Sequence, residues 1–170
     1  MGEMDAPTLY RLLQLRAEVF GLEQACPEQD LDGRDLEPGT RQLWITADDG
    51  TIASELRILR NTGGDGAVVY QIGRVCTHRA HRGRGHTRLL IAEALGEVGD
   101  HECRVEAQKY LAEMYVGHGF AVIGEEYLED GIPHVSMIRP AARKGVAWAY
   151  WGGAFAAHPL LAGKVINRAS

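Results

Sequence analysis

Apolar residues near the start of the chain recur at the spacing of a helix. In the segment 8–24 they fall three or four residues apart, so one face of a helix would be apolar. Thr8 is a candidate N-cap, and Cys26-Pro27 would end the helix. The positions that form the stripe are Leu9, Leu12, Leu13, the aliphatic stem of Arg16, Val19 and Phe20.

The pattern then changes to the period of strands. Segments 42–47 and 51–60 flank Asp48-Asp49-Gly50, and an Asp-Gly pair between two apolar runs is a strong hairpin signal. A glycine-rich turn over 61–66 leads to a third strand over 68–77. These three segments predict the antiparallel beginning of a sheet.

The second half of the chain alternates helices and strands. A helix with its apolar stripe over 90–98 is stopped by Gly99, and a short strand follows over 103–107. A short helix over 111–118 ends at Gly119. The last two strands are predicted over 120–123 and 132–139. The order α-β-β-β-α-β-α-β-β predicts one α/β domain over residues 1–140.

Residues 141–170 differ in character from the rest and are treated as a C-terminal extension. Their aromatic residues follow no clean period. The extension could be a docking arm, a segment that buries itself in a homodimer, or a poorly specified tail. The aromatic residues are Trp148, Tyr150, Trp151 and Phe155.

Composition excludes several classes of protein. A formal net charge of −5 argues against a general binder of nucleic acid or of anionic membranes. Cys26, Cys76 and Cys103 form no CxxC pair, which argues against a disulfide framework or a zinc knuckle. The N-terminus lacks the features of a signal peptide, and no run approaches the ~20 apolar residues of a membrane span. We therefore expect a cytoplasmic protein.

The segment Arg82-Gly83-Arg84-Gly85-His86-Thr87-Arg88 carries the most information about function. It connects a strand to an amphipathic helix. Glycines allow the main chain to approach a phosphate closely, and a helix N-terminus adds unpaired N–H donors. The arginines would offset the remaining charge of a pyrophosphate.

Three other interpretations of this segment compete with phosphate binding. A solvated basic loop would have the same composition, and a nucleic-acid contact conflicts with the acidic remainder of the chain. His78, His81 and His86 have a spacing that a metal site could use, but no further ligand lies nearby in the sequence, so we expect no metal. The position between a strand and a helix favours phosphate binding.

The motif R-x-x-G-x-G/A at this position resembles the acetyl-CoA signature of the GNAT acetyltransferase superfamily. Thr87 stands where the family usually has glycine or alanine, and its side chain would either donate to a phosphate or crowd it. Further matches over 8–139 resemble the ElaA-like branch. They are the segments 15–20, 23–27, 30–36, 72–75 and 129–134, while Gln108 with 114–120 resembles a segment of the superfamily as a whole.

The resemblance implies a GNAT-like fold with a V-shaped splay between two central parallel strands, along residues 72–77 and 104–107. It also implies acetyl-CoA as cosubstrate and a primary amine that attacks the thioester directly in a ternary complex. The backbone of Val75, Cys76 and Thr77 would pair with the pantetheine arm, with Val75 N–H facing the thioester oxygen. Gln108 would help to hold that arm.

Two residues are candidates for proton transfer. Tyr115 would be the general acid that protonates the departing thiolate, although an aromatic on a helix face can also simply pack. His134 would be the general base, with Glu23, Glu106 and Glu126 as alternatives. Cys76 has no sequence-local partner that would make it a nucleophile, which favours buried packing.

The acidic segment Asp30, Asp32, Asp35 and Glu37 lacks the spacing of a calcium loop and is expected to be solvated. If it borders the acceptor site, it would favour a cationic amine. The competing interpretations of the whole chain are a non-catalytic module that binds acyl-CoA or a partner protein and, third, a nucleic-acid-binding domain.

Overall fold

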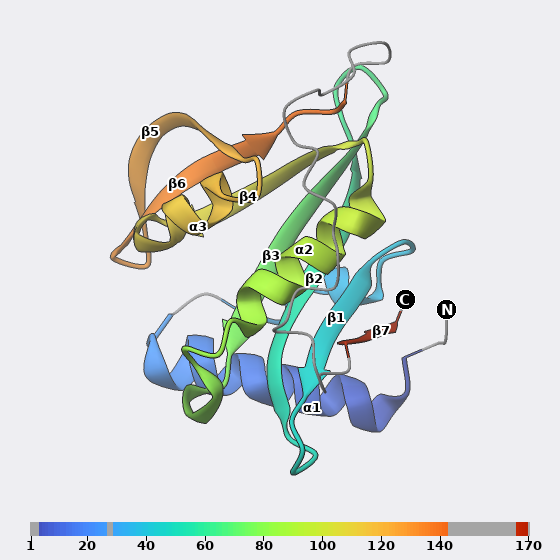
Figure 1. Cartoon of the computed structure of the whole chain (residues 1–170), viewed down its shortest axis with the longest axis vertical. Coiled ribbons are helices and arrows are strands. Elements are labelled where there is room, and N and C mark those ends of the chain that lie inside the picture. The colour runs from blue at the N-terminus through green and yellow to red at the C-terminus, as the bar shows by residue number, and fades with distance from the viewer. Residues whose placement is uncertain (1–3, 27–28, 143–165, 170) are drawn as a thin grey trace.

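A single mixed sheet organises the computed structural model, which describes residues 4–26, 29–142 and 166–169. Seven strands lie in the order β5-β6-β4-β3-β2-β1-β7 (Figure 1). Among the described strands β3 and β4 form the one parallel pair, so the predicted α/β fold with a mostly antiparallel sheet is confirmed. None of the helices in these ranges is long and apolar enough to cross a membrane.

The first helix, α1 (Ala6–Arg16), continues as a π-helix over Ala17–Glu23. Its N-cap is Asp5, whose carboxylate accepts hydrogen bonds from the backbone N–H of Thr8 at 2.7 Å and from its hydroxyl at 3.1 Å. The prediction of Thr8 as the cap was therefore wrong, because Thr8 supplies the donor. Buried Leu12, Leu15 and Val19 pack with Ile52 and Cys76 against one face of the sheet.

The antiparallel half of the sheet contains β1 (Arg41–Thr46), β2 (Ile52–Thr62) and β3 (Val68–Thr77), within two residues of the predicted bounds. The second long helix, α2 (His86–Val98), packs its apolar stripe against the face opposite α1 (Figure 1). Each face of this part of the sheet is covered by its own apolar cluster. β2 and β3 are therefore buried on both faces.

The other half of the sheet contains β4 (Glu102–Gln108), β5 (Ala121–Glu129) and β6 (Ile132–Arg139), with α3 (Ala112–Val116) after a 3₁₀ turn over Lys109–Leu111. The strand predicted over 120–123 extends six residues further. Gly124, at φ +78°, allows a bulge between Ile123 and Tyr127, after which the pairing with β6 resumes.

One strand was not predicted. Residues Ile166–Ala169 form β7 and pair with β1, with Ala169 opposite Gln42. Such a short strand has too few positions to display a period in the sequence. The aromatic segment of the extension lies outside the described residues, so its docking role and the boundary at residue 140 stay predictions.

The two central parallel strands separate soon after they meet. Their ladder joins Val69 to Glu102, Tyr70 to Cys103 and Gln71 to Arg104, and no further pair follows in the described strands. The predicted V-shaped splay is therefore confirmed, and Figure 1 shows β3 and β4 diverging from their shared end.

A bulge in β3 lies where the splay opens. Gly73 pairs with Arg57 and Cys76 with Glu55, so Arg74 and Val75 stand opposite the single residue Leu56. Arg74 has φ +52°. Two residues against one bend the bulged strand, which directs β3 away from β4.

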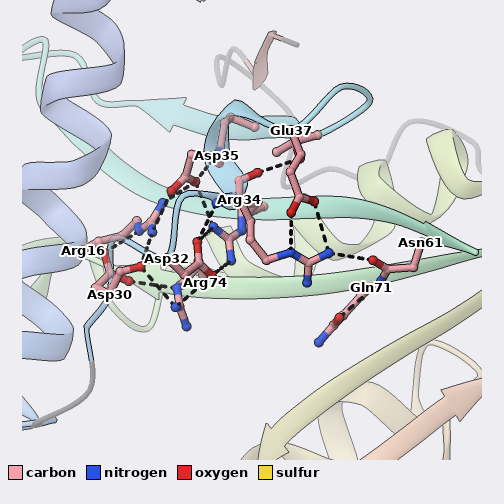
Figure 2. A network of polar contacts seen from close by, with 12 residues as sticks. Arg16, Asp30, Asp32, Arg34, Asp35, Glu37, Asn61, Gln71 and Arg74 are labelled. Atoms are coloured by element: carbon pink, nitrogen blue, oxygen red, sulfur yellow. Dashed lines mark hydrogen bonds and ion pairs between the residues drawn. The ribbon is translucent and has the colours of Figure 1, made fainter.

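An ion-pair network fastens the acidic segment to this bulge (Figure 2). Arg16, 1% exposed, contacts Asp30 at 2.9 Å and Asp35 at 2.7 Å. Arg74 contacts Asp30 at 2.9 Å and Asp32 at 3.3 Å. The expectation of a solvated acidic segment was wrong for Asp30, Asp32 and Asp35, which pair with arginines of the helix and the sheet, whereas Glu37 is exposed as expected.

Arg57 completes the network from β2. It contacts Asp32 at 2.6 Å and Asp35 at 3.1 Å. Its hydrogen bonds hold the pKa of Asp32 well below the usual range. Burial acts to raise the pKa of Asp35, but Arg16 and Arg57 outweigh it and the pKa is lowered. Both carboxylates therefore stay charged at neutral pH.

We predict that Arg16→Met destabilises the protein by about 3–5 kcal/mol, because Asp30 and Asp35 would lose a buried counter-charge. Urea unfolding monitored by circular dichroism measures this change. The matched control is Glu37→Gln, which breaks the more exposed ion pair with Arg34 in the same segment and should cost about 0–1 kcal/mol. Equal effects of the two substitutions would contradict the assignment.

Candidate functional site

The opening between β3 and β4 is a cleft of about 1210 Å³. β3 and β4 form its walls, and the glycine-rich segment closes one end. Every residue that the sequence predicted for the site lines this cleft. They are Val75, Cys76, Thr77, Arg82, Gly83, Arg84, Gly85, His86, Thr87, Arg88, Gln108, Tyr115 and His134.

The edge of β3 that faces the cleft is unpaired from Ile72 to Thr77 within the described structure. On its other edge the same stretch pairs with β2, which fixes its extended backbone. Exposed N–H and C=O groups of such an edge can pair with another extended chain. A flexible ligand with amide groups fits this requirement.

The glycine-rich segment ends at the N-terminus of α2. Gly85 is the N-cap residue at φ +76°, and Gly83 also has a positive φ of +73°. A side chain at either position would strain this backbone. The first intrahelical bond runs from Leu89 N–H to Gly85 C=O, so the preceding N–H groups of the first turn are available for an anion.

Side-chain contacts hold this segment in place. Arg82 donates through Nε to the carbonyl of Thr77 at 3.0 Å and pairs with Glu23 at 2.6 Å. The buried ring of His86 stacks on His81 with centroids 6.3 Å apart. The segment is therefore attached to the end of β3 and to the π-helix.

Thr87 directs its hydroxyl to β3. Its Oγ1 lies 3.1 Å from Thr77 Oγ1, which lies 2.8 Å from Ser54 Oγ. Ser54 in turn donates to the carbonyl of Cys76 at 2.9 Å. This chain of hydroxyls gives the threonine a structural partner, and it links the first turn of α2 to two strands.

Gln108 lies at the end of β4, where it donates through Nε2 to Gln24 Oε1 at 3.2 Å. Because Glu23 pairs with Arg82, neighbouring residues of the first helical segment contact both sides of the cleft. The partner of Gln108 could not be predicted from the sequence, since Gln24 is 84 residues away.

Tyr115 is 2% exposed and packs edge-on against Phe120, with ring centroids 5.7 Å apart. Burial raises the pKa of its phenol. The hydroxyl therefore keeps its proton at neutral pH. Packing and a proton-donor role are compatible at this position, because the residue both belongs to the core and lines the cleft.

His134 is 9% exposed, and its Nδ1 lies 2.8 Å from the carbonyl oxygen of Ile132. A carbonyl can only accept, so Nδ1 carries the proton and Nε2 is the basic nitrogen of the neutral ring. Nε2 lies 3.8 Å from a carboxylate oxygen of Glu129. The ring also stacks on Tyr127, with centroids 5.9 Å apart.

The three alternative bases occupy different environments. Glu23 lines the cleft but is bound to Arg82. Glu126 pairs with Lys109 and does not line the cleft. Glu106 lines the cleft and accepts hydrogen bonds from the hydroxyls of Tyr127 and Ser136, each at 2.6 Å.

Tyr127 and Ser136 did not stand out in the sequence. They reach Glu106 only because β4 pairs with β6 and β6 with β5. The alternation of His134 and Ser136 on one face of β6 is the signal that could have indicated them.

Cys76 is buried, and its thiol contacts the fully buried carboxyl of Glu55 at 3.6 Å. Burial raises the pKa of both groups, with Arg16 opposing the shift. This environment disfavours the thiolate and with it a nucleophilic role. Cys26, Cys76 and Cys103 form no disulfide with one another, and no cluster in the described ranges could hold a metal ion.

The chain resembles proteins of one known family over most of its length. Residues 10–139 match the acetyltransferase (GNAT) domain family. The UPF0039 protein Rv2851c of Mycobacterium tuberculosis is 51% identical over 140 residues, which cover 82% of this chain and 89% of that protein. Protein ElaA of Escherichia coli K12 is 38% identical over 142 residues, covering 81% and 91%.

Two solved structures are similar over nearly the same region. The crystal structure of Escherichia coli ElaA has a TM-score of 0.73 and 36% identity, and the match covers 81% of this chain and 93% of that one. An acyl-CoA N-acyltransferase from Pseudomonas aeruginosa has a TM-score of 0.71 and 38% identity, with coverage of 80% and 92%.

We predict that Thr87→Ala lowers stability by about 1 kcal/mol, because the hydrogen bond to Thr77 is lost. The affinity for acetyl-CoA should change by less than about threefold, since the hydroxyl faces β3. Thermal unfolding and calorimetric titration measure the two effects. A large gain in affinity would mean that the threonine crowds the phosphate.

Proposed function

The chain belongs to the ElaA-like branch of the GNAT acetyltransferase family, and we propose that it transfers an acetyl group from acetyl-CoA to a primary amine. The family supports acyl transfer from an acyl-CoA. The observation that carries the finer proposal is that one cleft joins an anion-binding helix N-terminus to an unpaired strand edge. These two features match the pyrophosphate and the amide-bearing pantetheine arm of coenzyme A.

The proposed reaction is a direct attack in a ternary complex. The acceptor arrives as an ammonium ion and gives one proton to His134 Nε2. The neutral amine then forms the N–C bond, while Val75 N–H stabilises the oxyanion. Breakage of the C–S bond releases a thiolate, which receives a proton from Tyr115. The second proton lost by nitrogen restores the phenol, so the net products are an amide, coenzyme A and one proton.

The positions of the two proton carriers support these roles. Tyr115 lines the cleft as a protonated phenol, and His134 directs Nδ1 to a backbone carbonyl, which leaves Nε2 as its basic nitrogen. Cys76, Thr77 and Gln108 would border the pantetheine arm. Arg82, Arg84 and Arg88 would surround the phosphates, with Gly83, Gly85, His86 and Thr87 supplying main-chain donors.

Titration with acetyl-CoA, with free coenzyme A and ATP as controls, is the first test. Saturable binding of acetyl-CoA in preference to ATP is expected, because ATP lacks the pantetheine arm that would pair with β3. Calorimetry measures the affinities. The absence of binding at millimolar acetyl-CoA would overturn the proposal and favour a protein-interaction module.

We predict that Tyr115→Phe lowers kcat by about a hundredfold and leaves the Kd for acetyl-CoA unchanged, because it removes only the proton donor. Steady-state kinetics with an amine acceptor and a separate binding titration separate the two quantities. The control is Tyr10→Phe, which alters an exposed tyrosine of α1. Unchanged turnover in Tyr115→Phe would contradict the general-acid role.

A further inference from the structure

Glu106 is a carboxylate held in one orientation at the cleft wall. The hydroxyls of Tyr127 and Ser136 both donate to its Oε2. Oε1 accepts no hydrogen bond from any residue that the structure describes, and Glu106 lines the cleft. One oxygen is therefore fixed by the protein while the other is open to a ligand.

The negative charge of Glu106 is also uncompensated. Its two donors are neutral, and within the described ranges it forms no ion pair with a cationic side chain. By contrast, the loop carboxylates Asp30 and Asp32 are paired with Arg16, Arg57 and Arg74. An oriented charge available to a cationic acceptor thus lies on β4, whereas the loop carboxylates on which the sequence placed that role are already paired.

The sheet register relates Glu106 to the proposed base. Gln108 is opposite His134 and Glu106 is opposite Ser136, so Glu106 and His134 are diagonal neighbours on one face. Such neighbours are about 7–8 Å apart. Tyr127 joins them, since its ring stacks on His134 and its hydroxyl donates to Glu106. A molecule with two amines a few carbon atoms apart could reach both.

We propose that Glu106 binds a second positive charge of the acceptor while the reacting amine lies at His134. The acceptor class is then a primary amine that carries another cationic group at the distance of a short aliphatic chain. Tyr127 and Ser136 are positioning residues that direct Oε1 into the cleft. This inference rests on the proposed amine acetyltransferase function and narrows its substrate.

The test compares 1,4-diaminobutane with 1-aminobutane, which lacks the second charge. In Glu106→Gln, kcat/KM for the diamine should fall about ten- to a hundredfold, because a hydrogen bond to a charged group is lost. The fall should come from a rise in KM. The value for 1-aminobutane should stay within about twofold. The matched control is Glu126→Gln, which removes a carboxylate outside the cleft and should alter neither amine.

Tyr127→Phe and Ser136→Ala test the positioning roles. Each keeps the charge of Glu106 and removes one donor, so the KM for the diamine should rise about threefold to tenfold at unchanged KM for acetyl-CoA. Unfolding midpoints equal to that of the original protein exclude a general loss of structure. A fall in kcat alone, equal for both amines, would contradict positioning of the second charge.

Two further outcomes would overturn the inference. One is a ratio of diamine to monoamine activity that Glu106→Gln leaves unchanged, and the other is an equal loss for both amines. If neither amine is turned over, calorimetric binding of 1,4-diaminobutane in the presence of coenzyme A decides. The inference is supported if the original protein binds the diamine and the Glu106→Gln variant does not. It is rejected if the original protein does not bind the diamine. The acetyl-CoA titration tests the underlying function separately.

Discussion

The ion pairs of Arg74 with Asp30 and Asp32 hold the point at which β3 leaves β4. Arg74 has a positive φ of +52°, a conformation that costs a non-glycine residue about 1–2 kcal/mol. Contacts from its guanidinium offset that cost. The same carboxylates form further ion pairs, Asp30 with Arg16 and Asp32 with Arg57. The bulge, the splay and the cleft between the strands all follow from this arrangement, so ion pairs along the wall of the cleft determine the shape of the site.

The two ends of the cleft are built differently. At the end formed by α2, main-chain groups predominate: the N-terminus of the helix follows Gly85, and the unpaired edge of β3 leads away from it. At the end formed by β4 and β6, side chains predominate, with Glu106 and His134 on one face. A backbone site constrains the sequence mainly through glycine, whereas a side-chain site changes with each substitution. Under the proposed function, substitutions at the side-chain end would change acceptor binding more readily than cosubstrate binding.

The sequence predicted what depends on local pattern. Helical and strand periods located the two long helices and six strands, and the glycine-rich segment was recognisable because it is contiguous. Contacts between distant segments were not predictable. The loop carboxylates looked solvated because their partners come from α1, β2 and β3. The strand predicted over 120–123 stops before Gly124, because glycine occurs in both bulges and turns and the sequence does not distinguish them. The donors to Glu106 become visible only once the register of three strands is known.

The cleft contains carboxylates in two electrostatic states, and the difference has a physical cause. Asp32 faces guanidinium groups, which lower its pKa and cancel its charge at short range. Glu106 faces hydroxyls, which orient it without supplying a positive charge. A charge that is already paired has little to gain from a ligand, because a new ion pair must replace an existing one. A charge that is oriented but unpaired gains fully from an incoming cation. Selectivity for a cationic acceptor therefore depends on which partners surround each carboxylate, more than on how many carboxylates line the cleft.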